Sequence, residues 1–101
     1  MNENTNFATM LKMMWDMQVP IITVEYVEEK MYGDRWSVTH HIVVPNGKDK
    51  VTDICFVDGN HTDKEYLVSI KQLDMNLMDA LVEFGKKALV SQGGILTLHS
   101  N

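Results

Sequence analysis

Histidine, cysteine and carboxylate side chains are the residues of this chain that could do chemistry, and the adjacent pair His40 and His41 is the most conspicuous. Imidazole binds metals and exchanges protons near neutral pH. The residues from Trp36 to Val44 alternate as in a strand, where successive side chains point to opposite faces. The two histidines therefore cannot share one metal ion. We expect His40 on the apolar face as a hydrogen-bonded core residue and His41 on the other face, beside Thr39.

Carboxylates near other candidate residues give only weak indications of a metal site or of acid–base catalysis. Asp58, His61 and Asp63 share one turn and could bind a cation. This turn lacks, however, the regularly spaced acidic ligands and the final glutamate of a calcium-binding loop. Glu28 and Glu29 end a strand, where charged side chains protect a sheet edge from aggregation. We therefore expect no metal site, no cofactor and no catalytic residues. A small metal-dependent hydrolase is an alternative, and it needs His40 or His61 beside an acid in a pocket.

Nucleophilic and phosphate-binding motifs are also missing from the sequence. Cys55 is the single cysteine and stands between Ile54 and Phe56, an apolar setting that predicts a buried and inert thiol. The pair Gly93-Gly94 follows a helical segment, which is the wrong order for a loop that presents phosphate to a helix N-terminus. Neither Gly-x-Ser-x-Gly nor His-Glu-x-x-His occurs.

The elements that must position these residues follow from the spacing of apolar side chains. Alternation predicts four strands, at about 21–31, 36–44, 51–57 and 65–70, with a hairpin at Asn46-Gly47. Helical spacing predicts helices from about Thr5 to Met17 and from Met75 to Ser91. A short strand at 95–98 could join a sheet edge or pair with another subunit. The expected fold is α+β and a single globular domain over residues 1–101. It is an antiparallel four- to five-stranded meander sheet with two helices packed mainly on one face, in the order α-β-β-β-β-α-β.

The first helix carries more apolar surface than one core can cover. Its main face consists of Phe7, Met10, Leu11 and Met14. Met13 and Met17 widen this face on one side and Trp15 on the other, so that the apolar arc spans about 200°, twice what a core-facing helix needs. We expect Met10 and Met14 in the core. Methionine side chains adapt to irregular surfaces, and we therefore expect Met13, Trp15 and Met17 to contact a binding partner.

The second helix has an ordinary apolar stripe bounded by charges. Asp74 is its expected N-cap and Gly93 its expected C-cap. Gly85 falls in the middle of the buried face, where glycine is unfavourable by about 0.5–1 kcal/mol relative to alanine. A close approach to the sheet or to the first helix is the expected compensation.

Charge and composition restrict the partners. The formal net charge is −5, with acids and bases interspersed along the chain, which disfavours binding to nucleic acid or to an anionic membrane. No apolar run approaches the roughly 18 residues of a membrane span, and no signal peptide is visible. The single cysteine fits a reducing compartment. We expect a cytoplasmic protein.

These features predict a small, acidic, non-enzymatic module that binds another protein. The residues expected to bind are Met13, Trp15 and Met17, together with Glu25, Glu28 and Glu29. In size, acidity and methionine content the chain looks like the accessory inhibitors with which phages and mobile elements block host or defence proteins. The acidic surface would suit a basic partner that itself handles nucleic acid. A structural homodimer with a symmetric seam at the first helix, and without another partner, is an alternative.

RNA binding is a further alternative, because the order helix, antiparallel strands, helix resembles that of the double-stranded-RNA-binding domain. The resemblance implies a basic cluster at the start of the last helix. This chain has Asp74 and Asp79 there instead, and two carboxylates repel a phosphate backbone. Nucleic acid is therefore not the expected partner.

Overall fold

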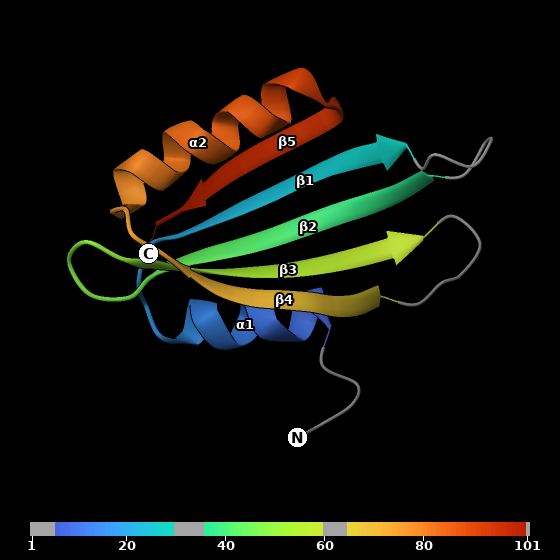
Figure 1. The fold of residues 1–101 in the computed structure, drawn as a ribbon. Helices are drawn as coiled ribbons and strands as arrows, with labels where there is room; N and C mark the ends of the chain where they lie inside the picture. Colours follow the sequence, from blue (N-terminus) through green and yellow to red (C-terminus); the bar gives the residue numbers. More distant parts are fainter. Residues whose placement is uncertain (1–5, 30–35, 60–64, 101) are drawn as a thin grey trace.

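The computed structural model describes residues 6–29, 36–59 and 65–100, which form a five-stranded antiparallel sheet with one helix on each face (Figure 1). In chain order the elements are α1 (Phe7–Asp16), β1 (Ile21–Glu29), β2 (Trp36–Pro45), β3 (Val51–Gly59), β4 (Glu65–Leu73), α2 (Leu77–Val90) and β5 (Gln92–His99). The α+β class and the order of elements are as predicted. Neither helix in the described part of the chain is long and apolar enough to cross a membrane.

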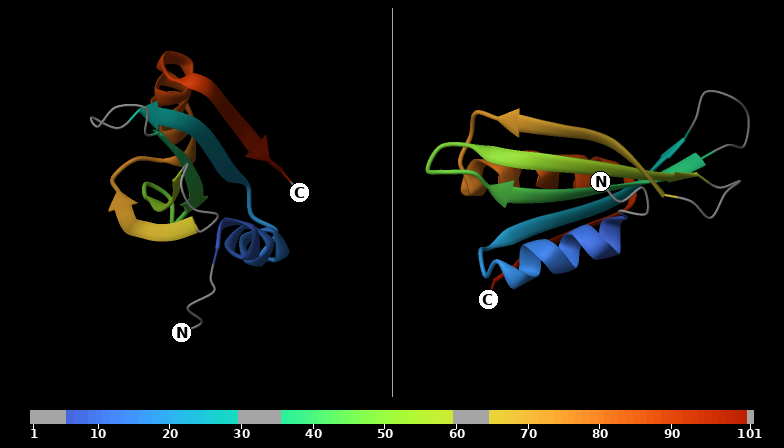
Figure 2. Two further views of the ribbon diagram at one scale, coloured as in Figure 1. Left: turned by 90° about the vertical axis from the view of Figure 1, so that its right-hand side faces the viewer. Right: turned by 90° about the horizontal axis from the view of Figure 1, so that it is seen from below.

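The strands lie in the order β4-β3-β2-β1-β5, so the first four form the predicted meander. The last strand pairs antiparallel with β1, with Ile22 opposite Leu98 and Val24 opposite Leu96. The C-terminal strand therefore joins the chain's own sheet, and β4 and β5 are its two edges. The sheet is strongly twisted, as the two views of Figure 2 show.

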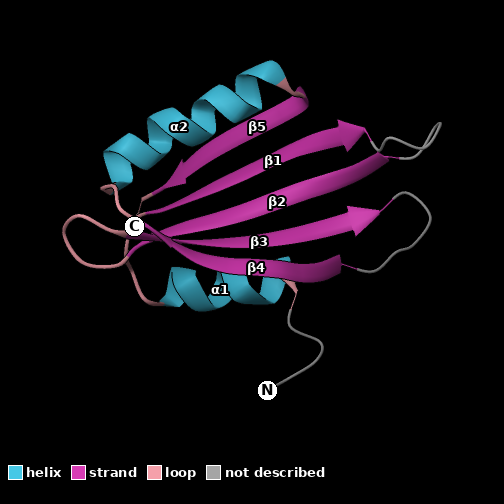
Figure 3. Ribbon diagram, in the orientation of Figure 1, coloured by secondary structure: helices cyan, strands magenta, loops and turns pink. Residues whose placement is uncertain are grey.

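The two helices cover opposite faces of the sheet, and the prediction that both pack mainly on one face is wrong (Figures 2 and 3). The reason is that the strands are apolar on both faces. In β1, Ile21 belongs to the cluster under α1 and Ile22 to the cluster under α2. In β2, Ile42 and Val43 divide in the same way. Each helix can therefore bury a separate apolar layer.

Polar side chains fix where the helices begin. The side chain of Asn6 caps α1 by accepting a hydrogen bond from the backbone of Thr9, and the backbone N–H of Phe7 donates to Glu65 Oε2 of β4 at 2.9 Å. Asn76, not Asp74 as predicted, caps α2. Asp74 instead forms an exposed ion pair with Lys50 at 2.8 Å.

Two glycines allow the chain to reverse from α2 into β5. Gly93 has a φ of 62° and lies in β5, so it is not the helix C-cap, a position that Ser91 occupies. A Cβ on Gly94 would overlap the carbonyl of Ala88. By contrast, a Cβ on Gly85 would lie 3.9 Å from Leu96 Cδ1, an ordinary contact. The close approach predicted at Gly85 is therefore wrong, and the backbone comes close at Gly94 instead.

Candidate functional site

Helix α1 divides into a buried face and two exposed flanks. Phe7, Met10, Leu11 and Met14 pack against the cluster on this side of the sheet, as predicted. Met13 and Met17 remain 56% and 63% exposed, and Trp15 remains 45% exposed. The excess apolar surface of the first helix is therefore outside the chain's own core.

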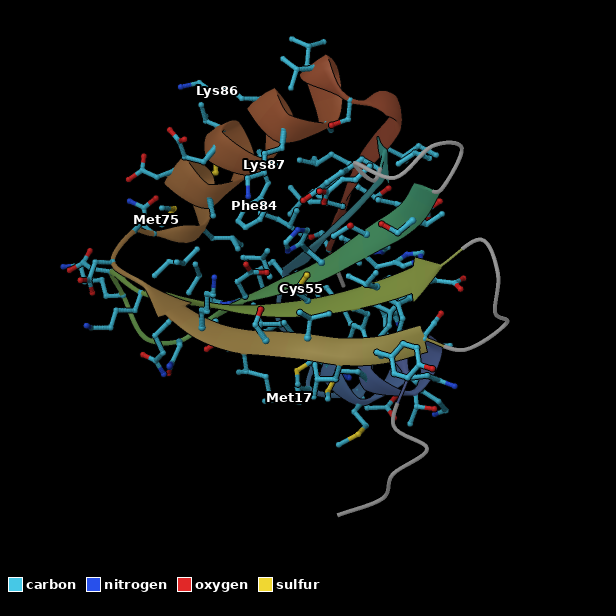
Figure 4. All side chains as sticks on the ribbon, turned by 45° about the vertical axis from the view of Figure 1, so that its right-hand side comes forward. Met17, Cys55, Met75, Phe84, Lys86 and Lys87 are labelled. Carbon is cyan, nitrogen blue, oxygen red and sulfur yellow. The ribbon has the colours of Figure 1, made fainter. Side chains whose placement is uncertain are left out.

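The two flanks face different sheet edges. The Trp15 ring meets the His99 ring of β5 edge-on, with ring centroids 5.8 Å apart. Met13 and Met17 lie on the other side of the buried face: at about 100° per residue, they are about 120° and 80° from Phe7 in one direction, whereas Trp15 is about 80° from Phe7 in the other. Figure 4 places Met17 on the α1 side of the sheet.

A third exposed apolar side chain lies on this face of the sheet. Ile70 of β4 is opposite Ile54, which belongs to the cluster under α1, so both side chains point to the α1 side. Ile70 is nevertheless 58% exposed. We call Met13, Met17 and Ile70 the α1–β4 surface. Sequence reasoning missed Ile70, because only the register shows which face of β4 an isoleucine occupies.

The acidic residues predicted to help in binding do not form one surface with α1. Glu25 lies on the α1 face, with Oε2 3.4 Å from His40 Nδ1. Glu28 accepts a hydrogen bond at 2.9 Å from the hydroxyl of Thr39, on the face that α2 covers. The side chain of Glu29 lies outside the described part. Glu25 and Glu28 therefore cannot contact one flat partner together.

The two histidines point to opposite faces, as predicted. His40 lies under α1 with its ring tilted against Phe7, the centroids 4.9 Å apart. Its Nδ1 is buried, and although Glu25 Oε2 lies 3.4 Å away, this nitrogen makes no hydrogen bond to any residue that the structure describes, so the expectation of a hydrogen-bonded ring is wrong for this nitrogen.

His41 belongs to a buried polar cluster under α2 that three strands build. Its Nε2 is 2.8 Å from the hydroxyl of Tyr26 on β1, and its Nδ1 is 2.8 Å from Asp53 Oδ1 on β3. All three side chains are buried. Phe84 of α2 covers the cluster, with its ring centroid 5.0 Å from that of His41. We call Tyr26, His41 and Asp53 the histidine cluster.

The environment favours the protonated form of His41. Burial, the largest single influence, lowers its pKa, but the side chains of Asp53 and Cys55 together outweigh burial and raise the pKa to about 9. At neutral pH both ring nitrogens then carry protons, and they donate to Asp53 and to Tyr26. Burial and the nearby Glu28 raise the pKa of Tyr26 to about 12, so its hydroxyl stays neutral.

This arrangement holds His41 between Tyr26 and Asp53. A general base needs an unprotonated nitrogen within reach of a substrate, whereas both nitrogens of His41 are occupied and the ring is covered. Cys55 is buried as predicted, but its setting differs from the expectation. Its apolar chain neighbours Ile54 and Phe56 point to the other face, and His41 and Ser69 are its partners on the adjacent strands.

A cavity of about 630 Å³ opens beside Phe84, along α2 and the end of β4 (Figure 4). Its apolar lining includes Leu73 and Met75. Its charged lining combines two lysines with two acids, namely Lys86, Lys87, Asp79 and Glu83. Because these charges balance, the cavity does not select a ligand by its charge.

The predicted turn around Asp58 is described only in part. Asp58 ends β3, whereas His61 and Asp63 lie outside the described residues. Within residues 6–29, 36–59 and 65–100, no group of three histidine, cysteine or acidic side chains is placed to hold a metal ion. Comparison with protein-family models, curated proteins and solved structures found no match to this chain.

Proposed function

We infer that this protein is a non-enzymatic module that binds another protein through the α1–β4 surface. The observation that carries this proposal is that Met13, Met17 and Ile70 present three flexible or branched apolar side chains on one face, each more than half exposed. An incomplete core does not explain why these side chains are exposed, because Met10 and Met14 already complete the buried face of α1.

The chemistry of the surface suits a protein partner. Two unbranched thioethers can repack against an irregular apolar surface, and apolar patches of this kind mark interaction sites in proteins. Trp15, on the other flank of the helix, offers an aromatic ring of the type that dominates interface energies. Such a surface offers little to a nucleic acid, whose recognition depends on cationic and stacking groups.

The charge of the chain indicates the kind of partner. A net charge of −5 on 101 residues speeds association with a basic protein and slows association with an acidic one. The proposed partner is therefore a protein with a basic surface around an apolar groove, such as one that handles nucleic acid. By binding there, this chain would inhibit or regulate that protein.

Photo-cross-linking tests this proposal directly. A photoreactive phenylalanine replaces Met17, the cells that naturally contain the protein are irradiated, and cross-linked products are identified by mass spectrometry after nuclease treatment. We expect one protein partner. The same amino acid at Met78, a similarly exposed methionine of α2 on the opposite face, serves as the matched control, which is scored only by its cross-linking to that same partner and not to a second copy of this chain.

Substitutions then measure the contribution of the surface. Met13→Glu with Met17→Glu should reduce affinity for the cross-linked partner at least tenfold, whereas Met78→Glu should leave it unchanged. Circular dichroism verifies that each variant is folded. Equal cross-linking from Met17 and Met78, or a product that disappears with nuclease, would contradict the proposal; the second result would support RNA binding instead.

A further inference from the structure

We propose that two copies of this chain pair through the edge strand β5 and the outer side of α2, forming a continuous ten-stranded sheet. This inference concerns a surface on the other side of the molecule from the α1–β4 surface and does not depend on the proposed function. It rests on the open edge of β5, on an exposed apolar stripe along α2, and on the way these two features adjoin.

The edge strand β5 is suited to pairing with another strand. One side of it is bonded to β1, and the other side has no strand neighbour among the described residues. Proteins normally protect such an edge with charged residues or proline. The segment Gln92–His99 contains no Asp, Glu, Lys, Arg or Pro, and Ile95 and Leu98 are substantially exposed on it.

Helix α2 continues this exposed surface. At 100° per residue, Met78, Val82 and Leu89 fall within about 40° of one another, and Gly85 lies beside them. All three side chains are more than half exposed. The stripe adjoins β5, because Gly85 is the helical residue whose Cβ would contact Leu96. A depression of about 420 Å³ at this junction, lined in part by Leu89 and Gly94, can receive a side chain from the second copy.

A single two-fold axis pairs the open edge of β5 with its copy and brings the two α2 helices to the same side. Antiparallel pairing of β5 with its copy, about an axis near Leu96 or Thr97, places both α2 helices on the same face of the joined sheet, antiparallel to each other. The helix contacts β5, β1 and β2, and its segment from Gly85 to Leu89 is the part that lies beside β5, so this segment of each helix faces the second copy.

A surface without charge is what allows a second copy of this acidic chain to be the occupant. Two molecules of charge −5 repel each other, and they associate most easily through a surface without charge. The β5 strand and the α2 stripe form such a surface, and it is complementary to itself. Met78, Val82, Leu89 and Leu98 lie on the α2 side of the sheet, whereas Ile95, which is opposite Glu25, lies on the α1 side. Pairing of the two β5 strands brings both sides of the edge into the interface, where these five side chains present on the order of 600 Å² of exposed area per copy, against the roughly 800 Å² per partner of a standard interface.

The opposite edge of the sheet is less suited to pairing. The β4 strand carries Glu65 and Lys71, and a register shift between Cys55 and Phe56 disturbs its ladder. Charges and bulges are devices that keep edges apart. Glu65 is in addition engaged by the N-terminus of α1.

Light scattering coupled to gel filtration tests the dimer. We expect a mass twice the 11.6 kDa of the chain. Leu89→Glu should raise the dissociation constant at least tenfold. Val90→Glu is the matched control, because Leu89 and Val90 are 85% and 84% exposed but point 100° apart. Val90→Glu should keep the dimer.

Chemical cross-linking keeps the proposal testable if Leu89→Glu fails to fold. Thr97→Cys in a Cys55→Ser background should give a covalent dimer with a short bismaleimide, and Thr9→Cys on the exposed side of α1 should not. A monomeric mass at 100 µM would overturn the proposal. So would a dimer that Met17→Glu dissociates and Leu89→Glu does not, because that dimer would use α1. If the dimer is observed but cross-linking from Met17 captures no protein partner, only the proposed function is refuted.

Discussion

His41 Nδ1 lies 2.8 Å from Asp53 Oδ1, and both side chains are buried between the sheet and α2. Neither residue is directly opposite the other, since His41 pairs with Cys55 and Asp53 with Val43. The contact runs diagonally between two strands. It places a protonated imidazole and a carboxylate in the apolar layer that α2 covers, and this has consequences for stability.

Stability should fall as the pH rises from about 6.5 to about 9. The pKa of His41 is raised from 6.5 to about 9 in the folded protein, so its stabilising contribution is complete below pH 6.5 and is lost as the pH passes the folded value. The loss should be on the order of 3 kcal/mol. Urea unfolding at several pH values, with reductant present, measures it. His41→Gln should flatten the dependence, and His40→Gln should retain it.

Asp53→Asn should destabilise the protein by about 3 kcal/mol at pH 7, because it leaves a buried imidazolium without its counter-charge. The control is Asp58→Asn on the same strand, which should cost less than about 0.5 kcal/mol. In a His41→Gln background the effect of Asp53→Asn should shrink. Additive effects of His41→Gln and Asp53→Asn in urea unfolding would show that the two side chains do not interact.

Met14→Ala and Met13→Ala should differ, although the residues are adjacent. Met14 packs against the cluster under α1, and its truncation should cost about 1–2 kcal/mol. Met13 is exposed, and its truncation should change the free energy of unfolding by less than about 0.5 kcal/mol. Thermal and urea unfolding give both values. A large loss at Met13 would place it in the core and remove it from the α1–β4 surface.

Gly94→Ala and Gly85→Ala should have opposite signs. A Cβ at Gly94 would overlap the backbone of Ala88, so the α2–β5 reversal must open and the protein should lose stability. A Cβ at Gly85 makes only an ordinary contact, and the gain in helix propensity should stabilise the protein by about 0.5–1 kcal/mol. Both are best compared in the Leu89→Glu background, where subunit association does not contribute to unfolding.

Local spacing in the sequence was sufficient for the elements and for the inner and outer sides of α1. The separation of Met10 and Met14 from Met13 and Met17 follows from helical geometry alone. The strands and their meander order followed from alternation and turn residues for a similar reason, because both are properties of residues close in the chain. The class of the fold was therefore predictable.

Only the tertiary structure decided which face each helix covers and which polar side chains meet. The sequence did indicate that both faces of the sheet are buried, because Ile21-Ile22 and Ile42-Val43 are apolar at consecutive positions. It did not indicate which helix covers which face. No sequence pattern predicted the histidine cluster, because the contact between His41 and Asp53 depends on the register of β2 against β3. A shift of one residue would turn Asp53 to the other face. Register is set by the packing of the whole sheet, and so the buried ion pair could not be read from the chain.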